Sequence, residues 1–475
     1  MSIRFAGVTV LAVVLLGGCT TVGPDYALPA AAAIRLPAAN GAFAGTAANA
    51  VSSEPVVGPW WQLFDDPVLE QLVDAALVSN TDLRVAAANL ARAEAIDSEA
   101  AAAGHPRLVA SAAVERTQLS GESYLLPVRL PDMNVADVGA TVAYQVDLVG
   151  RLRRASEAAT ADREATAAAL DVARITVIAD VARAYIAACA AGYERATTLA
   201  LVGTQERTLS VVSRLADAGR GTDIDVTRAR ALLDQQRAVL PTYDARQRTA
   251  LYRLAVLTGK PPTEFPEIVA ACAELPRVSR PIPVGDGAAL LRRRPDVRQA
   301  ERTLASATAR IGVATAALYP SISIGLGGGS TGLLADLGEP ATNHWSIGTL
   351  ISWTMPDGRE RARIRQADAT AAAALAHFDA VVLNALRETE TALSVYASDS
   401  ERNQALRTAR DEAARADEEA QRLYRAGRHP YLSALDARRT LEATEDAVAA
   451  SDVQLTGDRI NLFLALGGGW ESPAR

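Results

Sequence analysis

Two copies of one pattern decide the fold of this chain: Asn80-Thr-Asp-Leu83 leads to His105-Pro106, and Arg294-Pro-Asp-Val297 leads to Tyr319-Pro320. The two segments have equal length and align without a gap. Further matches follow in the same order: Tyr144-Gln-Val-Asp-Leu-Val-Gly150-Arg151 with Trp353-Thr-Met-Pro-Asp-Gly358-Arg359, Ala218-Gly-Arg220 with Ala426-Gly-Arg428, and Leu257-Thr-Gly259 with Leu466-Gly-Gly468. An internal repeat of this kind predicts that each half is one structural unit.

Each half is predicted to contain a helix, a β hairpin, a long helix, a turn and a return helix. The first repeat covers residues 61–259, with its hairpin at 107–148, its long helix at 151–217 and its turn at 218–222. The second repeat covers residues 289–469, with its hairpin at 320–356, its long helix at 359–425 and its turn at 426–430. Residues 260–288 link the two repeats, and 470–475 form a C-terminal tail.

The helical parts follow from periodicity and composition. Leu69, Leu72, Val73, Ala76 and Leu77 form one apolar stripe at helical spacing. Residues 359–425 contain neither Gly nor Pro, and a helix of that length is a rod of roughly 100 Å. Such a rod must pack along its length as a coiled coil. A soluble helical bundle has the same features, so the strands must decide between the two.

The hairpins alternate apolar with small or polar residues, as strands with two different faces do. Trp345, Ile347, Ile351 and Trp353 share one face, and Tyr144 ends another such strand. These strands have the length of a transmembrane strand, ~9–11 residues, with aromatic residues at the ends as in an interfacial girdle. A half-buried soluble sheet shows the same alternation. If the strands lie in a membrane, four per chain are too few to close a barrel, so the protein must be a homo-oligomer that shares one.

Composition restricts the class of protein. With 49% hydrophobic and 22% charged residues, the chain is not globally disordered. A net charge of −7 argues against a nucleic-acid partner. A length of 475 residues suggests about three domains as a prior. The repeat replaces that estimate with two copies of one unit. Aromatic residues are only 5% of the chain, as expected for Ala-rich rods that have no thick core to fill.

The N-terminus predicts export. Residues 1–18 form a signal peptide, with Arg4 before an apolar stretch that is too short to span a bilayer. Leu16-Gly-Gly-Cys19 resembles a bacterial lipobox, which makes Cys19 the lipidated first residue of the mature chain. An ordinary signal peptide followed by a chance cysteine is the alternative. Thr20, where Asp favours inner-membrane retention, indicates sorting to the outer membrane.

Two other cysteines, Cys189 and Cys272, allow a disulfide in an oxidising periplasm. Sequence alone gives no distance between them. The interpretation favoured here is that the two cysteines are separate buried residues that pack as small apolar side chains.

These features together resemble the TolC family of outer-membrane efflux proteins, in particular its NodT-type lipoproteins of RND tripartite efflux systems. The matching motifs span nearly the whole chain. They are Cys19 with Val22-Gly-Pro-Asp-Tyr26, Trp60-Trp61-x-x-Phe64-x-Asp66-Pro67-x-Leu69, Asp147-Leu-Val-Gly150-Arg151, Leu291-Arg-Arg-Arg294-Pro295-Asp296-Val297-x-x-Ala300-Glu301, and Ala465-Leu-Gly-Gly-Gly-Trp470.

The resemblance implies a mixed architecture, a membrane β-barrel continued by a long α-helical barrel. It implies a homotrimer in which each protomer gives four strands to a shared twelve-stranded barrel. Residues 19–60 become a lipid-anchored N-terminal segment, and 260–288 an equatorial linker. The implied partners are a periplasmic adaptor (membrane fusion protein), an inner-membrane RND pump and outer-membrane lipid, and the implied location is the bacterial outer membrane, with an extension into the periplasm.

The same resemblance makes the two turns the periplasmic tip, where the coils close and the adaptor docks. The implied docking residues are Gly219, Gly221, Thr222, Gly427, His429 and Pro430. By position, the resemblance makes Asp225, Asp436 and the nearby Tyr424 candidate gate residues. In a trimer each of the two aspartates would become a ring of three carboxylates, which favours cations. Pro430 follows His429 where a cationic gate residue is expected, which puts a charge link there in doubt. Helix-dipole stabilisation of first-turn carboxylates is the alternative role for Asp223, Asp225 and Asp436.

The sequence shows no catalytic motif and predicts no enzyme, cofactor or metal site. His105, His344, His377 and His429 form no metal-like pair at helical spacing. The predicted function is an outer-membrane exit duct that passively conducts drugs or other small solutes. The alternatives are an exit channel for type I protein secretion and a periplasmic coiled-coil scaffold.

Overall fold

A computed structural model of the 475-residue chain describes residues 21–44, 51–52, 54, 58–278 and 280–467. The predicted signal peptide 1–18, the predicted lipidation residue Cys19 and the tail 470–475 lie outside the described residues. The chain divides into two compact units: unit 1 is 1–29, 90–166 and 300–378, and unit 2 is 30–89, 167–299 and 379–475. Each unit therefore contains segments of both predicted repeats.

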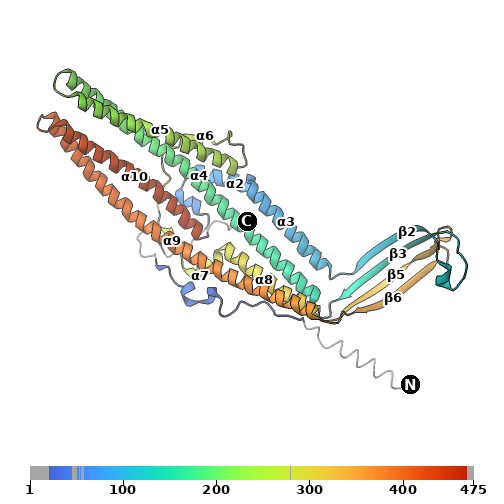
Figure 1. The fold of residues 1–475 in the computed structure, drawn as a ribbon. Coiled ribbons are helices and arrows are strands. Elements are labelled where there is room, and N and C mark those ends of the chain that lie inside the picture. Colours follow the sequence, from blue (N-terminus) through green and yellow to red (C-terminus); the bar gives the residue numbers. More distant parts are fainter. Residues whose placement is uncertain (1–20, 45–50, 53, 55–57, 279, 468–475) are drawn as a thin grey trace. The chain divides into compact units, whose positions relative to one another are not determined.

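Unit 1 contains a four-stranded antiparallel sheet (Figure 1). Its strands are β2 (Arg107–Thr117), β3 (Met133–Val146), β5 (Ser321–Leu333) and β6 (Asn343–Ser352), in the spatial order β2-β3-β5-β6. Tyr144 lies opposite Ile324, and Trp345 lies opposite Gly328. Short 3-10 helices, η5 (Gly121–Tyr124) and η6 (Leu334–Asp336), occur in the two hairpin loops. Among the described residues, β2 and β6 each pair with a strand on one side only.

Four helices enter and leave the hairpins. α3 (Thr81–Ala102) and α8 (Pro295–Ala316) precede them, and α4 (Arg151–Asp217) and α9 (Gly358–Arg425) follow. At 1.5 Å per residue the last two are each about 100 Å long. Each of these two helices contains a stretch that is long and apolar enough to cross a membrane by length and composition. The stretch in α4 is 78% buried, and the stretch in α9 is 17% buried.

An aspartate begins each long helix, which explains the Asp-Leu-Val-Gly-Arg motif. The Asp147 carboxylate accepts backbone N–H bonds from Leu152 at 3.1 Å and Arg153 at 2.9 Å. In the second copy, Asp357 accepts from the Arg359 N–H at 2.6 Å. These bonds satisfy N–H groups that have no partner within the helix. The motif therefore marks the passage from strand to long helix.

A short segment, residues 22–25, is held to α4 by the buried side chain of Arg154 and is called the strap below. The Val22 N–H donates to the Val149 carbonyl at 3.0 Å. The Arg154 guanidinium donates to the carbonyls of Val22 and Gly23 and forms an ion pair with Asp25 at 2.7 Å. Gly23 has a positive φ of 83°, and a Cβ there would lie 2.4 Å from the Gly312 Cα. The Val-Gly-Pro-Asp-Tyr motif is therefore a segment that docks within unit 1. Its second residue must be glycine, because no side chain fits at position 23.

The return helices complete unit 2. α5 (Asp223–Leu257) runs back beside α4, and α10 (Tyr431–Ala465) runs back beside α9 (Figure 1). Shorter elements complete this unit: η1 (Ala33–Arg35), η2 (Pro37–Ala39), η4 (Trp60–Phe64), α2 (Pro67–Ser79), α6 (Glu267–Ala270), α7 (Gly287–Arg293), and a parallel pair of β1 (Val51–Ser52) with β4 (Ile282–Pro283).

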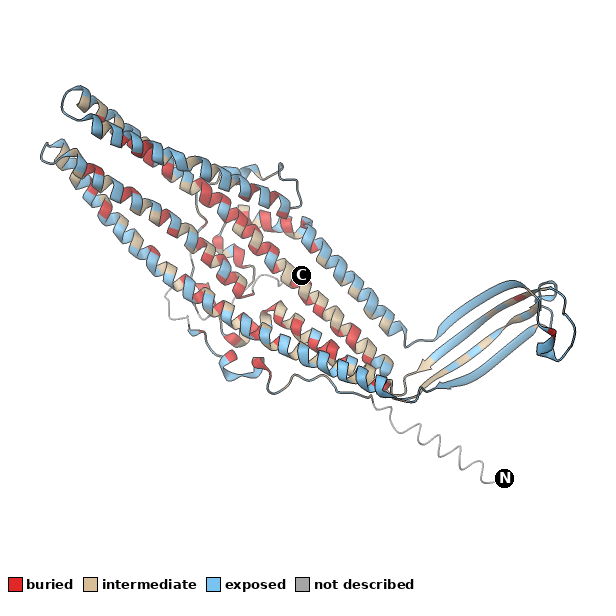
Figure 2. Ribbon diagram, in the orientation of Figure 1, coloured by how far each residue is buried: buried red, intermediate tan, exposed pale blue. Residues whose placement is uncertain are grey.

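The main hydrophobic core lies in unit 2, where buried residues concentrate, whereas the sheet of unit 1 is largely exposed (Figure 2). Trp60 is fully buried and stacks on Phe463 with ring centroids 5.0 Å apart. Asp66 begins α2, and its carboxylate accepts a 2.7 Å hydrogen bond from the Tyr185 hydroxyl on α4. Trp60 and Trp61, which is 8% exposed, are therefore packing residues of this core.

The expectation that Cys189 and Cys272 are two separate buried residues was wrong. They form a disulfide that joins α4 to the segment after α6, with a Cα–Cα distance of 4.9 Å. Gly192 makes the close approach possible, because a Cβ there would lie 2.0 Å from the Cys272 carbonyl oxygen. The residues are 83 positions apart, and only the fold brings them within bonding distance.

Candidate functional site

The first of the two turns, between α4 and α5, starts with backbone hydrogen bonds around Gly219 that end α4. Gly219 has a φ of 71°, and its N–H donates to the Ala216 carbonyl at 2.9 Å. The Arg220 N–H donates to the Leu215 carbonyl at 2.8 Å. This is a Schellman motif, which ends a helix with a left-handed residue and favours glycine there. Gly221 lies directly against the same turn, since a Cβ on it would be 3.2 Å from the Ala216 nitrogen.

Asp225 is part of a capping box at the start of α5. The Thr222 hydroxyl accepts from the Asp225 N–H at 3.3 Å, and the Asp225 carboxylate accepts from the Thr222 N–H at 3.2 Å. The Thr222 hydroxyl also donates to that carboxylate at 2.7 Å. The arrangement satisfies helix N–H groups and places a negative charge at the positive end of the helix. The structural role considered for Asp225 is therefore present in the fold.

The second turn has the same helix end but a different helix start. Gly427 has a φ of 68°, and the Arg428 N–H donates to the Leu423 carbonyl at 2.9 Å. Pro430 is the N-cap of α10 and makes no side-chain cap. His429 and Pro430 are exposed. The two turns thus share their glycine and differ in how the following helix begins.

Two tyrosines pack together beside the second turn. The rings of Tyr424 and Tyr431 have centroids 5.5 Å apart. Burial and the negative charge of Asp225 raise the pKa of Tyr424. Burial, followed by Tyr424 and Asp225, raises the pKa of Tyr431 to about 12. Asp225 and Tyr424, both expected at the gate, therefore lie within electrostatic reach of each other, and Tyr431 joins them.

Asp436 differs from Asp225 in its surroundings. It is exposed and lies in the second turn of α10, beyond the first turn where the helix dipole acts strongly. The dipole explanation considered for Asp436 is therefore wrong.

A buried charged cluster between α9 and α10 was not recognised in the sequence. Glu442 on α10 is 3% exposed, and burial is the first cause that raises its pKa to about 7. The Arg438 guanidinium lowers that pKa, whereas Asp446, Glu445 and Asp417 raise it. Arg438 bonds the buried Asp417 at 2.9 Å. A run of charged residues normally indicates a solvated helix face, so only packing distinguishes these from their exposed neighbours.

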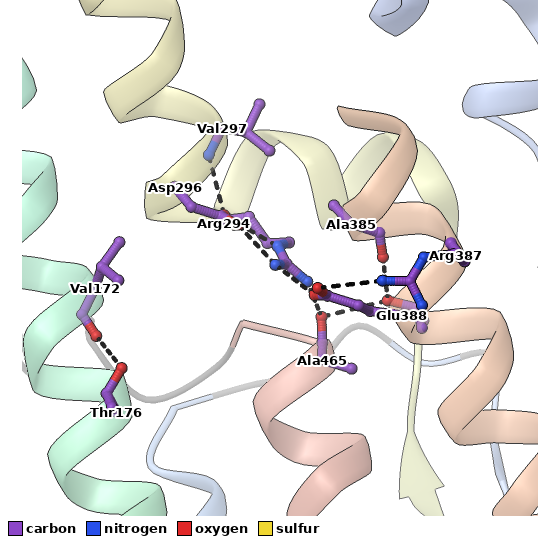
Figure 3. Close-up of polar contacts among 10 residues, drawn as sticks. Val172, Thr176, Arg294, Asp296, Val297, Ala385, Arg387, Glu388 and Ala465 are labelled. Atoms are coloured by element: carbon purple, nitrogen blue, oxygen red, sulfur yellow. Dashed lines mark hydrogen bonds and ion pairs between the residues drawn. The ribbon is translucent and has the colours of Figure 1, made fainter. Parts of the chain in front are cut away.

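The motif Arg293-Arg294-Pro295-Asp296 lies between α7 and α8 and connects them to α9 and to the end of α10 (Figure 3). Arg294 bonds Asp296 through Nε at 3.0 Å and Nη2 at 2.6 Å, and it reaches Glu388 on α9 at 2.9 Å. Its Nη1 donates to the Ala465 carbonyl at the end of α10 at 2.8 Å. Arg293 donates to the next carbonyl, that of Leu466. The motif therefore opens α8 at Pro295 and also caps the end of α10.

The aromatic residues predicted at a membrane interface are exposed, Tyr144 and Trp345 on strands of the sheet and Trp353 directly after β6. Tyr144 is 39%, Trp345 78% and Trp353 51% exposed. Trp345 and Trp353 bracket Ile347 and Ile351 on one face, and at about 3.4 Å per residue they lie roughly 27 Å apart along the strand direction. An apolar band of about 25 Å flanked by aromatic residues is typical of outer-membrane barrels.

The part of the chain that the structure describes contains no group of three or more His, Cys, Asp or Glu residues placed to hold a metal ion.

Comparison with known proteins identifies the class to which this fold and these turns belong. The model of the outer membrane efflux protein family matches residues 72–260 and 288–468. The chain belongs to the outer membrane efflux protein family, as the motif resemblance predicted.

Individual relatives cover nearly the whole chain. It is 31% identical to the solvent efflux pump outer membrane protein SrpC of Pseudomonas putida, over 98% of this chain and 99% of that protein. It is 29% identical to nodulation protein T of Rhizobium leguminosarum bv. trifolii, with 97% of each covered. The structure matches that of the outer-membrane channel OprN with a TM-score of 0.88 and 35% identity, covering 94% of this chain and 99% of that one. The predicted NodT-type relationship is confirmed, and the chain is an outer-membrane efflux component with a TolC-like channel fold.

Proposed function

We propose that three copies of this chain form the exit duct of a tripartite RND-type efflux system, which passively conducts drugs or other small solutes to the cell exterior. The observation that carries the proposal is the four-stranded sheet with an unpaired edge at β2 and another at β6 within the described residues. Open strand edges are not tolerated in lipid, so further copies must pair with them. Three copies would give a shared barrel of twelve strands.

The long helices support the same assembly. The apolar stretch of α9 is only 17% buried in one chain, which leaves an Ala-rich surface for neighbouring helices to cover. Small side chains permit the close helix packing that a shared α-helical barrel requires. Native mass spectrometry of the detergent-extracted protein should give three times the mass of the mature chain, and a monomer would contradict the assembly.

The two halves of the protomer are proposed to be copies of one unit, 61–259 and 289–469, joined by the equatorial linker 260–288. The two ranges matched by the family model, 72–260 and 288–468, support this division.

Lipid anchoring through Cys19 after removal of residues 1–18 is part of the proposal. The strap at residues 22–25 supports it, because Val22 is bonded to Val149 beside the sheet of unit 1. Palmitate incorporation should disappear in Cys19→Ser, and labelling that persists would contradict the anchor.

The turns at 218–222 and 426–430 are proposed to meet the periplasmic adaptor and to form the closed end of the duct. Asp225 and Tyr424 support a gate here, since the Asp225 charge acts on Tyr424 from the neighbouring turn. Asp436 would add an exposed carboxylate to the same end. In a trimer these acids would form rings that favour cations.

Single-channel recording in planar bilayers tests the gate. Asp225→Ala with Asp436→Ala should raise the conductance and weaken block by divalent cations. Thr222→Ala is the matched control, because it breaks the capping box and keeps both carboxylates. Equal conductance of the double variant and the unmodified protein would contradict the gate, and an equal rise in Thr222→Ala would assign closure to the cap instead of the charge.

A further inference from the structure

Unit 2 contains a cavity of about 460 Å³ where the ends of α8 and α10 meet between α4 and α9. Its walls include Val172, Ile175, Ala392, Val395 and Leu464. Val172 and Thr176 lie on one side, and Arg294, Glu388 and Ala465 lie on the other (Figure 3). The volume is in the range of small-molecule sites, which combine apolar walls with a few placed polar groups.

One buried carboxyl group in this cavity has an unsatisfied oxygen. Asp458 on α10 lines the cavity and is 3% exposed. Its Oδ1 accepts from Gln454 Nε2 at 3.0 Å, whereas its Oδ2 has no hydrogen-bond donor among the described residues. The Asp399 carboxyl lies within hydrogen-bonding reach of Asp458, but it can donate only when one of the two acids carries a proton, so the ionised pair has no donor between its members. Leaving a buried acceptor without a donor is costly, so the site is suited to a ligand that donates.

The other charges around the cavity are already balanced. Arg294 is satisfied by Asp296, Glu388 and the Ala465 carbonyl. Arg387 donates to the Asn384 side chain and lies 3.8 Å from Glu388. The unbalanced charge is therefore the negative charge of the Asp458–Asp399 pair. Since the described residues include no metal-type cluster, an organic cation fits the site better than a metal ion.

We propose that this cavity binds a small amphipathic organic ammonium ion, with its apolar body between α4 and α9 and its ammonium group against Asp458. The ammonium N–H groups supply the donor that Asp458 lacks, and the aliphatic wall buries the apolar part. The inference concerns binding alone, so it stands or falls independently of conduction through the duct.

The site also has an expected pH dependence. Burial and the adjacent Asp399 carboxyl raise the pKa of Asp458 to about 6, against a smaller lowering by Gln454. The other charged groups that face the cavity are Arg387 and Glu388 on α9 and Arg294 and Asp296 at the start of α8. Below its pKa Asp458 is neutral and attracts a cation less, so binding should weaken between about pH 7.5 and about pH 5.

The test uses the full-length protein in lipid nanodiscs and the fluorescent probe naphthylmethylammonium, with signal from empty nanodiscs subtracted. The neutral alcohol of the same shape, naphthylmethanol, measures the apolar contribution alone. Asp458→Asn removes the charge and keeps the shape, and it should fold because it imitates the protonated acid. Asp411→Asn on the exposed surface of α9 is the matched control for loss of one negative charge.

Asp458→Asn should raise the dissociation constant of the ammonium probe about tenfold, and Asp411→Asn should leave it unchanged. Equal affinity for the ammonium and the alcohol, or unchanged affinity in Asp458→Asn, would overturn the proposal. Absence of saturable binding in the unmodified protein would overturn it as well and would leave Asp458 and Asp399 as a pair that shares one proton.

Discussion

Cys189 and Cys272 form a disulfide across 83 residues of chain, between the middle of α4 and the segment that follows α6. The bond closes a loop that contains the turn between α4 and α5 and all of α5. A crosslink over a loop of this length restricts the unfolded chain strongly, and the chain-entropy model gives about 4.5 kcal/mol of stabilisation.

Replacing both cysteines by serine should therefore lower the temperature midpoint of unfolding. The free energy of unfolding should fall by up to about 4.5 kcal/mol. Circular dichroism before and after reduction measures the effect. Reduction should destabilise the unmodified protein and have no effect on the double variant. Alkylation of both thiols in the non-reduced, folded protein would contradict the bond.

Glu442 should make the stability of unit 2 depend on pH. Its pKa is raised by burial from 4.5 to about 7. Because the folded state retains the proton over this range and the unfolded state loses it, the stability that this group contributes is fully present below about pH 4.5 and is lost as the pH rises through about 7. The loss from this group is of order 3 kcal/mol.

Glu442→Gln should remove most of that decline. At pH values above 7, it should raise the urea concentration at the midpoint of unfolding. The raised pKa values of Glu445 and Asp446 act in the same direction and account for the remaining slope. Glu418→Gln, on the exposed face of α9, is the control. A pH profile that Glu442→Gln leaves unchanged would show that this carboxyl is not the source.

Arg294→Lys should destabilise the joint between α8, α9 and α10. A lysine carries one charge but cannot form the forked contacts that Arg294 makes with Asp296, Glu388 and the Ala465 carbonyl. The expected cost is about 1–3 kcal/mol, because the buried Ala465 carbonyl and the two carboxylates lose hydrogen bonds from a charged donor. Arg292→Lys, at an exposed position of the same arginine run, should change stability little. Equal effects of the two variants on urea unfolding would contradict the capping role.

Arg154→Ala should release the strap at residues 22–25. The Arg154 side chain is 4% exposed and binds two backbone carbonyls and Asp25. Hydrogen exchange at the Val22 amide should speed up about tenfold, which corresponds to 1.4 kcal/mol of local stability. Arg153→Ala is the control, since its side chain is 70% exposed. Full protection of Val22 in Arg154→Ala would show that the Val149 carbonyl holds the strap alone.

Some features of the fold were readable in the sequence because they depend on neighbouring residues. The alternation of Ile322, Ile324 and Leu326 sets one face of β5, and the absence of Gly and Pro between residues 359 and 425 permits one uninterrupted helix. Gly219 and Gly427 marked both helix ends, because a left-handed residue is required there. The family followed from motifs distributed along the same chain.

Other features depended on which distant residues meet. No local pattern distinguishes Glu442, buried beside Arg438, from the exposed Glu418. Nor does any local pattern show that Asp458 and Val172 line the same cavity. The disulfide of Cys189 was misjudged for the same reason, since its partner is 83 residues away. By itself the sequence determined the helices, the strands and their turns, whose energetics are local. The tertiary structure alone decided burial, charge pairing and the cavity, because these arise from contacts between helices far apart in the chain.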